Sequence, residues 1–204
     1  RNNNVWIGSY DKGFTVWNKS LEFFNSENQL TNLIKNKFVT RIIEDRFGNL
    51  WLGTRYHGLF LYTPSGKVTV YNANNTKLFH ENNPIESLFI DSKDRIWIGL
   101  PNQLIVGSIS ANGQILLPEQ KGIEQVRMMK EDQYGHLWIG SWNGLIRINS
   151  DLTPDNQPKR IYQGNIPDFY VGDSGDLIFS SYGEGIYFLA KDDTIPMIIE
   201  VPEI

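Results

Sequence analysis

The chain is a series of short apolar segments separated by turns rich in Gly and Asp. Residues 39–44 carry apolar side chains in both alternation phases, which predicts an inner strand buried on two faces. A tight turn follows, and residues 50–54 predict a second strand. Further strands at 59–63 and 68–71 complete an antiparallel meander of four strands.

This unit recurs along the chain at intervals of 40 to 46 residues, each marked by a Trp or by Ile178 in its place. The recurring positions are Trp6, Gly8, Asp45, Gly48, Trp51, Gly53, Asp91, Trp97, Gly99, Asp132, Gly135, Trp138 and Gly140. A period of about 40 to 50 residues is typical of a propeller blade. The sequence therefore predicts an all-β β-propeller of about five repeat units, the first lacking its upstream half, in one domain spanning residues 1–204.

The recurring residues have structural roles in this interpretation. The Asp of each turn binds nearby backbone amides, and the turn Gly adopts a positive φ. Trp51 and Gly53 share a face because side chains repeat every second residue along a strand. We expect the indole to pack between neighbouring blades and the Gly to allow a close approach. Segments 30–38 and 119–125 have room for one helical turn each, but crossovers between blades are favoured there.

Composition excludes several function classes. The net charge of −4 gives no basic stripe for nucleic acid. The sequence has no cysteine and no apolar run long enough to span a membrane. His57, His80 and His136 lack metal-ligand spacing and are expected on surface loops, so neither a metal nor another cofactor is predicted. No phosphate-binding Gly motif opens a helix, which argues against kinase activity within these residues.

The repeated phrases resemble a known family. The segment from Val39 to Phe60, with Asp45-Arg-Phe-Gly48-Asn-Leu-Trp51-Leu-Gly53 at its centre, is similar to the two-component regulator propeller repeat. So is the segment from Asp132 to Arg147. The resemblance covers nearly the whole chain in five copies. Asp94 and Gln103 depart from it, because each replaces a usual Gly, and the fifth copy has no Trp.

The resemblance implies the extracytoplasmic, periplasmic part of a hybrid histidine kinase that senses breakdown products of polysaccharides. In such receptors two propellers of about seven blades precede a small all-β domain, a transmembrane helix and the kinase. The resemblance thus implies signal transduction through a phosphorelay, a homodimeric parent receptor and a segment that is not itself catalytic or in contact with the membrane.

Open sheets leave unpaired edges, so a propeller is stable when its ring closes. We therefore expect these residues to be a piece of a larger ring of about seven blades. The alternative is closure with five blades, with 194–201 supplying an edge strand.

The loops between the second and third strands vary while their flanks repeat. They are expected to emerge at the same end as the crossovers and to converge around the axis. Their aromatic rings suit the C–H faces of a sugar, and their planar polar groups suit its hydroxyls. The predicted ligand is an oligosaccharide, and the candidate site residues are Arg55, Tyr56, Trp142, Asn143, Tyr182 and Glu184.

Two alternatives belong to other classes of protein. A glycan-cleaving enzyme needs two carboxylates about 5 to 9.5 Å apart, and the loop acids at the same end are Asp11 and Glu184. These would be neighbours only in a ring closed with five blades. The other alternative is a protein-interaction platform in which the loop aromatics anchor a partner chain. A purely structural role would also explain the aromatic residues of these loops, since they could cover the top of the blade core without binding a ligand.

Overall fold

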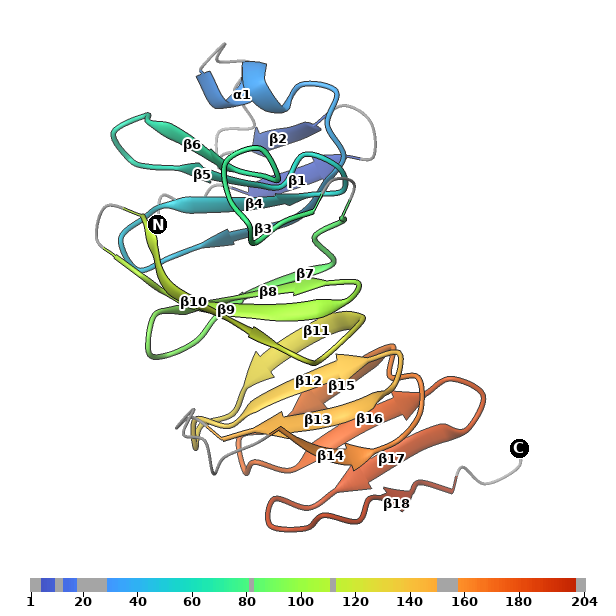
Figure 1. Cartoon of the computed structure of the whole chain (residues 1–204). Helices are drawn as coiled ribbons and strands as arrows, with labels where there is room; N and C mark the ends of the chain where they lie inside the picture. Colours follow the sequence, from blue (N-terminus) through green and yellow to red (C-terminus); the bar gives the residue numbers. More distant parts are fainter. Residues whose placement is uncertain are drawn as a thin grey trace. The chain divides into compact units, whose positions relative to one another are not determined.

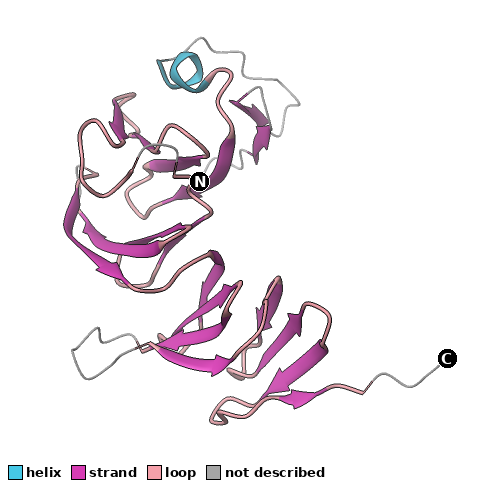
Figure 2. Ribbon diagram, turned by 45° about the vertical axis from the view of Figure 1, so that its right-hand side comes forward, coloured by secondary structure: helices cyan, strands magenta, loops and turns pink. Residues whose placement is uncertain are grey.

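The computed structural model describes residues 5–9, 13–17, 29–80, 83–110, 113–149 and 158–200. Two compact units make up the chain, Arg1–Lys121 and Gly122–Ile204. Within the described ranges one short helix, α1 (Gln29–Ile34), accompanies the strands (Figure 1, Figure 2). The prediction of an all-β chain is confirmed, and the single-domain count stays a prediction.

Each repeat after the first folds as a four-stranded antiparallel sheet in which successive strands are neighbours (Figure 1). The described residues of the first repeat form a two-stranded sheet, β1-β2, which corresponds to the second and third strands of the other repeats. The strands are β1 (Val5–Ser9), β2 (Gly13–Trp17), β3 (Val39–Glu44), β4 (Leu50–Thr54), β5 (Leu59–Tyr62), β6 (Val68–Tyr71), β7 (Ser87–Ile90), β8 (Arg95–Leu100), β9 (Gln103–Ile109), β10 (Ile115–Lys121), β11 (Val126–Glu131), β12 (Leu137–Ser141), β13 (Gly144–Ile148), β14 (Lys159–Tyr162), β15 (Asp168–Val171), β16 (Leu177–Ser181), β17 (Gly185–Leu189) and β18 (Met197–Ile198).

The prediction that β3 is buried on both faces is wrong. Val39 is buried, but the rest of the strand is partly or fully exposed. The strand buried throughout is β4, the second in the sheet. The reason is the strand order, because β3 lies at the edge of its sheet whereas β4 has a hydrogen-bonded neighbour on each side.

The Trp of the repeat lies between sheets, as predicted. Trp51 on β4 has no exposed surface. It packs with Leu88 and Ile98 of the following sheet and with Ile85 in the crossover that leads into that sheet. In the second unit Trp138 on β12 packs with Ile166 and other residues of the sheet β15–β18. Trp97 is also fully buried. For Trp6 and Gly8 the structure describes the backbone of β1.

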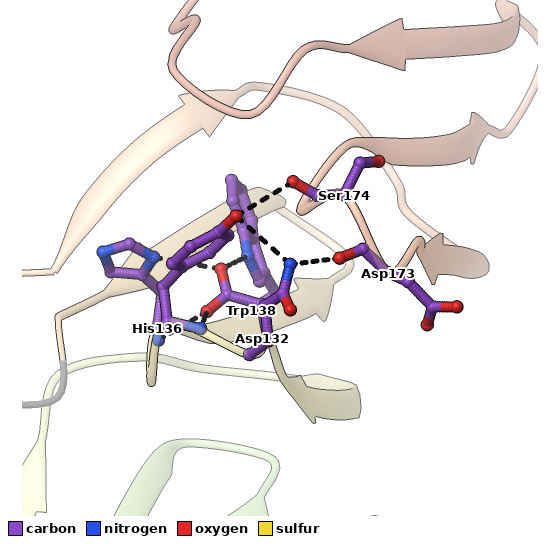
Figure 3. A network of polar contacts seen from close by, with 7 residues as sticks. Asp132, His136, Trp138, Asp173 and Ser174 are labelled. Atoms are coloured by element: carbon purple, nitrogen blue, oxygen red, sulfur yellow. Dashed lines mark hydrogen bonds and ion pairs between the residues drawn. The ribbon is translucent and has the colours of Figure 1, made fainter.

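The Asp of each turn does more than the sequence predicted. One oxygen of Asp45 accepts from the amides of Phe47 and Asn49, both at 2.9 Å, as expected. The other oxygen accepts from the indole Nε1 of Trp51, also at 2.9 Å. The pair Asp91–Trp97 repeats this bond at 2.8 Å. The pair Asp132–Trp138 repeats it at 3.0 Å (Figure 3). Each carboxylate therefore fixes both the turn and the buried indole.

The fifth repeat supports this coupling of Asp and Trp. Its turn keeps the backbone bond from Gly175 N to Gly172 O, at 3.0 Å. Gly172 stands at the Asp position, and Ile178, which is 42% exposed, stands at the Trp position. Both partners of the side-chain bond are thus replaced together. In the third repeat Asp94 occupies the turn Gly position with a φ of 57°, a conformation that Asp tolerates better than most residues.

The segments predicted as crossovers differ in structure. α1 lies in the segment before β3, and Ile34 at its end is buried with Val39 and Leu52. Between 119 and 125 the described residues form no helix, because β10 continues to Lys121. Within 194–201, β18 pairs with β17 as the fourth strand of its own sheet, and closure of a ring with five blades stays an untested alternative.

Gly53 is predicted to tolerate no side chain. A Cβ at this position would lie 2.7 Å from Cγ2 of Ile85, a buried atom of the inter-sheet core. We expect Gly53→Ala to lower the free energy of unfolding of the first unit by about 1–3 kcal/mol, measured by urea denaturation. Gly122→Ala is the control, since a Cβ at Gly122 would have nothing within 4 Å. Equal effects of the two substitutions would contradict the close approach.

Candidate functional site

The loops between second and third strands lie beside the crossovers in each unit, as predicted. In the first unit, the amide of Ile85 in the crossover before β7 donates to the carbonyl of Thr54 at 3.0 Å. In the second unit, Tyr182 N donates to Asn165 O, and Ile166 N donates to Ser141 O, both at 2.9 Å. The bonds from Ile85 and Ile166 connect the end of a second strand to the crossover that leads into the next sheet, and the bond from Tyr182 connects its loop to the crossover that leads into its own sheet.

A buried hydroxyl fixes the start of two of these loops. Thr54 Oγ1 donates to Gly58 O at 2.7 Å and accepts from His57 N at 3.0 Å. Ser141 Oγ makes the corresponding bonds to Gly144 O and from Asn143 N. The loop side chains therefore project from a backbone that these bonds hold in one conformation, which reduces the entropy lost when a ligand binds.

A cavity of about 470 Å³ opens beside the first of these loops. This volume lies within the range of about 300–1,000 Å³ that is common for small-molecule sites. The cavity lies between the β4–β5 loop, the crossover after β6 and the residues at and after the end of α1. Its lining residues are Leu33, Lys37, Tyr56, His57, Gly58, Phe60, Val70, Asn72, Ala73, Asn74, Phe79, His80 and Asn83.

At this cavity Arg55 makes a cation–π contact with the ring of Tyr56. The guanidinium of Arg55 lies 5.5 Å from the centre of the Tyr56 ring and 5.4 Å from that of Phe38. Tyr56 nevertheless keeps 54% of its surface exposed. The predicted role of Arg55 as a direct ligand contact stays a prediction, because the structure shows it stacked on two rings.

Sequence reasoning placed His57 and His80 on surface loops and gave them no role. Both are exposed, but they line the cavity together with Lys37. Burial and the nearby Lys37 charge lower the pKa of His57 from its ordinary value. The repeat pattern could not predict that the two histidines lie at one cavity, because their proximity depends on how the crossover after β6 passes the β4–β5 loop.

A second contact of this kind lies in the other unit. The guanidinium of Arg127, on β11, lies 5.0 Å from the centre of the Trp142 ring, which is 51% exposed. Arg127 also donates to Asn165 Oδ1 at 3.2 Å, and the carbonyl of Asn165 accepts from Tyr182 N. Asn165 therefore connects the two loops that present Trp142 and Tyr182, the latter 78% exposed.

Glu184 is held by two hydroxyls. Its Oε2 accepts a hydrogen bond from Tyr162 and another from Ser181 Oγ, the latter at 2.7 Å. These bonds, that of Tyr162 first, lower the pKa of Glu184 below its ordinary value. The carboxylate is therefore a fixed acceptor at the rim of the loop. Its catalytic partner in the enzyme alternative, Asp11, lies outside the described residues, as does Tyr10.

The six candidate residues fall into two groups. Arg55 and Tyr56 belong to the first unit, whereas Trp142, Asn143, Tyr182 and Glu184 belong to the second. Their convergence on one axis stays a prediction. In the described ranges no cluster of three His, Asp or Glu side chains is arranged to hold a metal ion. None of the helical structure described there is long and apolar enough to cross a membrane.

The sequence profile of the two component regulator propeller matches residues 33–56 and 122–143. Each match runs through the first two strands of a four-stranded sheet into the loop that carries the candidate residues. A comparison with curated proteins gave no match.

Solved structures share the fold at low sequence identity. The extracellular domain of a hybrid two-component system from B. thetaiotaomicron has a TM-score of 0.75 and 21% identity, covering 99% of this chain and 27% of that one. A second such extracellular domain from this organism has a TM-score of 0.65 and 21% identity, covering 88% and 25%. The dihydro-heme d1 dehydrogenase NirN has a TM-score of 0.68 and 14% identity, covering 96% and 43%.

The chain spans about a quarter of the length of the two extracellular domains, 27% and 25%. NirN shows that a similar propeller fold also occurs in an enzyme, so fold alone does not assign an activity. The two segments that match the two component regulator propeller profile, 33–56 and 122–143, each contain one of the Asp–Trp turns, Asp45–Trp51 and Asp132–Trp138.

Proposed function

We propose that the chain is a non-catalytic sensing segment of a periplasmic receptor, part of a homodimeric hybrid two-component histidine kinase, and that it binds an oligosaccharide at its loop end. The matched repeats and the fold shared with extracellular domains of such systems support the receptor assignment. Binding becomes a signal only if the ligand prefers one of two receptor states.

One observation carries the ligand assignment. In each unit a loop after the second strand presents an exposed aromatic ring, Tyr56 or Trp142, with an Arg guanidinium at one face. A ring fixed in this way offers its remaining surface to the C–H face of a sugar at little entropic cost. Polar groups beside it, such as Asn72 near Tyr56 and Asn143 after Trp142, suit the hydroxyls.

Replacing the loop aromatics is expected to weaken sugar binding. We predict that Tyr56→Ala or Trp142→Ala lowers affinity for an oligosaccharide about two- to tenfold, since an aromatic contact contributes about 0.5–1.5 kcal/mol. The measurement is calorimetric titration of the unaltered chain and of each variant with a set of polysaccharide fragments. Tyr170→Ala is the matched control. Tyr170 is also an exposed aromatic residue, at 60%, with a cation over its ring, since Lys130 Nζ lies 4.7 Å from the ring centre, but it belongs to strand β15 and not to a loop.

Three outcomes would contradict this function. If no fragment binds, or if both loop variants bind as the unaltered chain does, the loops do not hold the ligand. If Tyr170→Ala weakens binding equally, the effect is not local to the loops. Release of reducing ends during the incubation would support a glycan-cleaving enzyme instead, and the test needs only the same samples.

A further inference from the structure

The ionisable side chains with a positive charged form, Lys37, His57 and His80, set the charge of the cavity among the described residues that line it. None of these described lining residues is a carboxylate. The remaining polar side chains are the hydroxyl of Tyr56 and three amides, those of Asn72, Asn74 and Asn83. Lys37 and the Asn NH₂ groups offer hydrogen-bond donors to an anion, whereas the described lining offers a cation no carboxylate.

The apolar part of the lining is buried and preformed. Phe60 and Phe79 are each 3% exposed and provide a hydrophobic floor. Asn72 is held in place by two hydrogen bonds. Its backbone N–H donates to Asn75 Oδ1 at 2.9 Å, and its side-chain Oδ1 accepts from the backbone N–H of Asn74 at 3.0 Å. These two bonds fix the orientation of Asn72, whose Nδ2 is a hydrogen-bond donor. The cavity thus combines an apolar base with donors and positive charge at its rim.

We infer that this cavity binds an acidic sugar, with Lys37 and His57 at the carboxylate, Asn72 and Asn83 at the hydroxyls, and Tyr56 against the sugar ring. This inference rests on the proposed function and adds the chemical class of the ligand. The described lining has no carboxylate, so a neutral sugar would bring no charged partner for Lys37. A carboxylate pairs with it through a charge-assisted hydrogen bond, which is stronger than a neutral one.

The electrostatics of His57 give the site a pH dependence. Burial and Lys37 lower the pKa of His57 in the free chain. A bound carboxylate opposes both effects, since it favours the protonated imidazole. The other basic groups around the site are His80 in the crossover and Arg55 in the same loop, and they add attraction without reversing the sign. Affinity for an acidic sugar is therefore expected to rise as pH falls from 8 to about 6.

The test uses matched pairs of sugars that differ in a carboxylate. Oligogalacturonate is compared with the corresponding galactose oligomer, and a glucuronate-containing disaccharide with its glucose counterpart, by calorimetry at pH 6 and 8. We expect the acidic member of at least one pair to bind at least tenfold tighter, and Lys37→Met to remove about that factor. Lys35→Met is the charge-matched control, because Lys35 is exposed and is not part of the cavity lining.

The chain has three histidines, so NMR can locate the ligand independently of affinity. The imidazole signals of His57 and His80 should move with the acidic sugar, while those of His136, which is bonded to Asp132 in the other unit, should stay in place. A neutral sugar that binds as tightly and moves His57 would overturn the acidic specificity but leave the proposed function intact. An acidic sugar that leaves His57 and His80 unmoved would overturn this cavity as its site. Absence of binding by every pair would count against this inference and, if the wider fragment set also fails, against the proposed function.

Discussion

Trp138→Ala is expected to destabilise the second unit more than truncation of any exposed aromatic residue in that unit. Trp138 is 1% exposed and packs with Phe169, Leu177 and Phe179 of the adjacent sheet. Truncating a buried Trp costs about 3–5 kcal/mol, because it removes apolar contacts and leaves a cavity that neighbours fill only partly. The loss should appear as a lower urea midpoint and as faster amide exchange in β12 and β16.

The chain supplies a matched control four residues away. Trp142 is the same residue type in the same unit, but it is 51% exposed in a loop. Trp142→Ala is expected to change the free energy of unfolding by less than about 1 kcal/mol, as is usual for surface positions. A similar loss from both variants would mean that the repeat Trp is not a core residue, and a normal stability of Trp138→Ala would reject the inter-sheet packing on which the blade assignment depends.

The sheets were predictable because each repeat encodes them locally. The bounds of β4 and β6 are those that the pattern of 50–54 and 68–71 predicts, and β5 ends one residue early, at Tyr62. Alternation and turn residues determine strands that pair with their sequence neighbours, so no long-range information is needed. Burial of β3 was predicted wrongly for the opposite reason, since it depends on what lies beyond the edge of the sheet.

The candidate site was only partly predictable. Tyr56 and Trp142 stand out because they are aromatic residues at variable positions between repeating flanks, and the structure confirms that they are exposed. His57 and His80 line one cavity, but sequence reasoning missed them because they are 23 residues apart in the chain. Their proximity is a consequence of the crossover after β6, whose path follows no repeat. The only sequence signal was the basic character of the segments around 37, 57 and 80.

The spacing of Asp and Trp held more information than the turn interpretation used. Three Asp residues precede a Trp by six positions, and Gly172 and Ile178 replace both together. A hydrogen bond between the two side chains explains why the replacements occur in one repeat. A second regularity accompanies it, since the residues four positions after the Asp, namely Asn49, Arg95 and His136, each place a side-chain nitrogen on the same carboxylate oxygen.

Asp132→Asn should therefore be far more damaging than its small change in shape suggests. Asp132 Oδ1 accepts from the amides of Tyr134 and His136, both at 2.9 Å. Oδ2 lies 3.0 Å from both Trp138 Nε1 and His136 Nδ1 (Figure 3). In Asn one of the two acceptors becomes an NH₂ group, which faces donors whichever way the amide is turned. We expect a loss of about 2–4 kcal/mol at pH 7, because a buried donor is left unpaired.

The same carboxylate makes the loss depend on pH. Burial disfavours its charge, but the hydrogen bonds from Trp138 and His136 outweigh burial and hold the pKa of Asp132 below its ordinary value. A group whose pKa is lower in the folded state stabilises the fold above its unfolded pKa of about 4, and this contribution disappears as pH falls through the folded value. The difference between wild type and Asp132→Asn should hence be largest near pH 7 and shrink below about pH 4.

Urea denaturation of both proteins from pH 7 to pH 3 measures this difference, with Asp193→Asn as the control at an exposed position in the same unit. The control should follow wild type at every pH. A gap between wild type and Asp132→Asn that stays constant down to pH 3 would show that the carboxylate charge is irrelevant to the turn. A difference in stability that disappears on acidification would instead establish that the ionised carboxylate holds the turn and the buried indole together. It would also explain why Asp and Trp are present or replaced as a pair in these repeats.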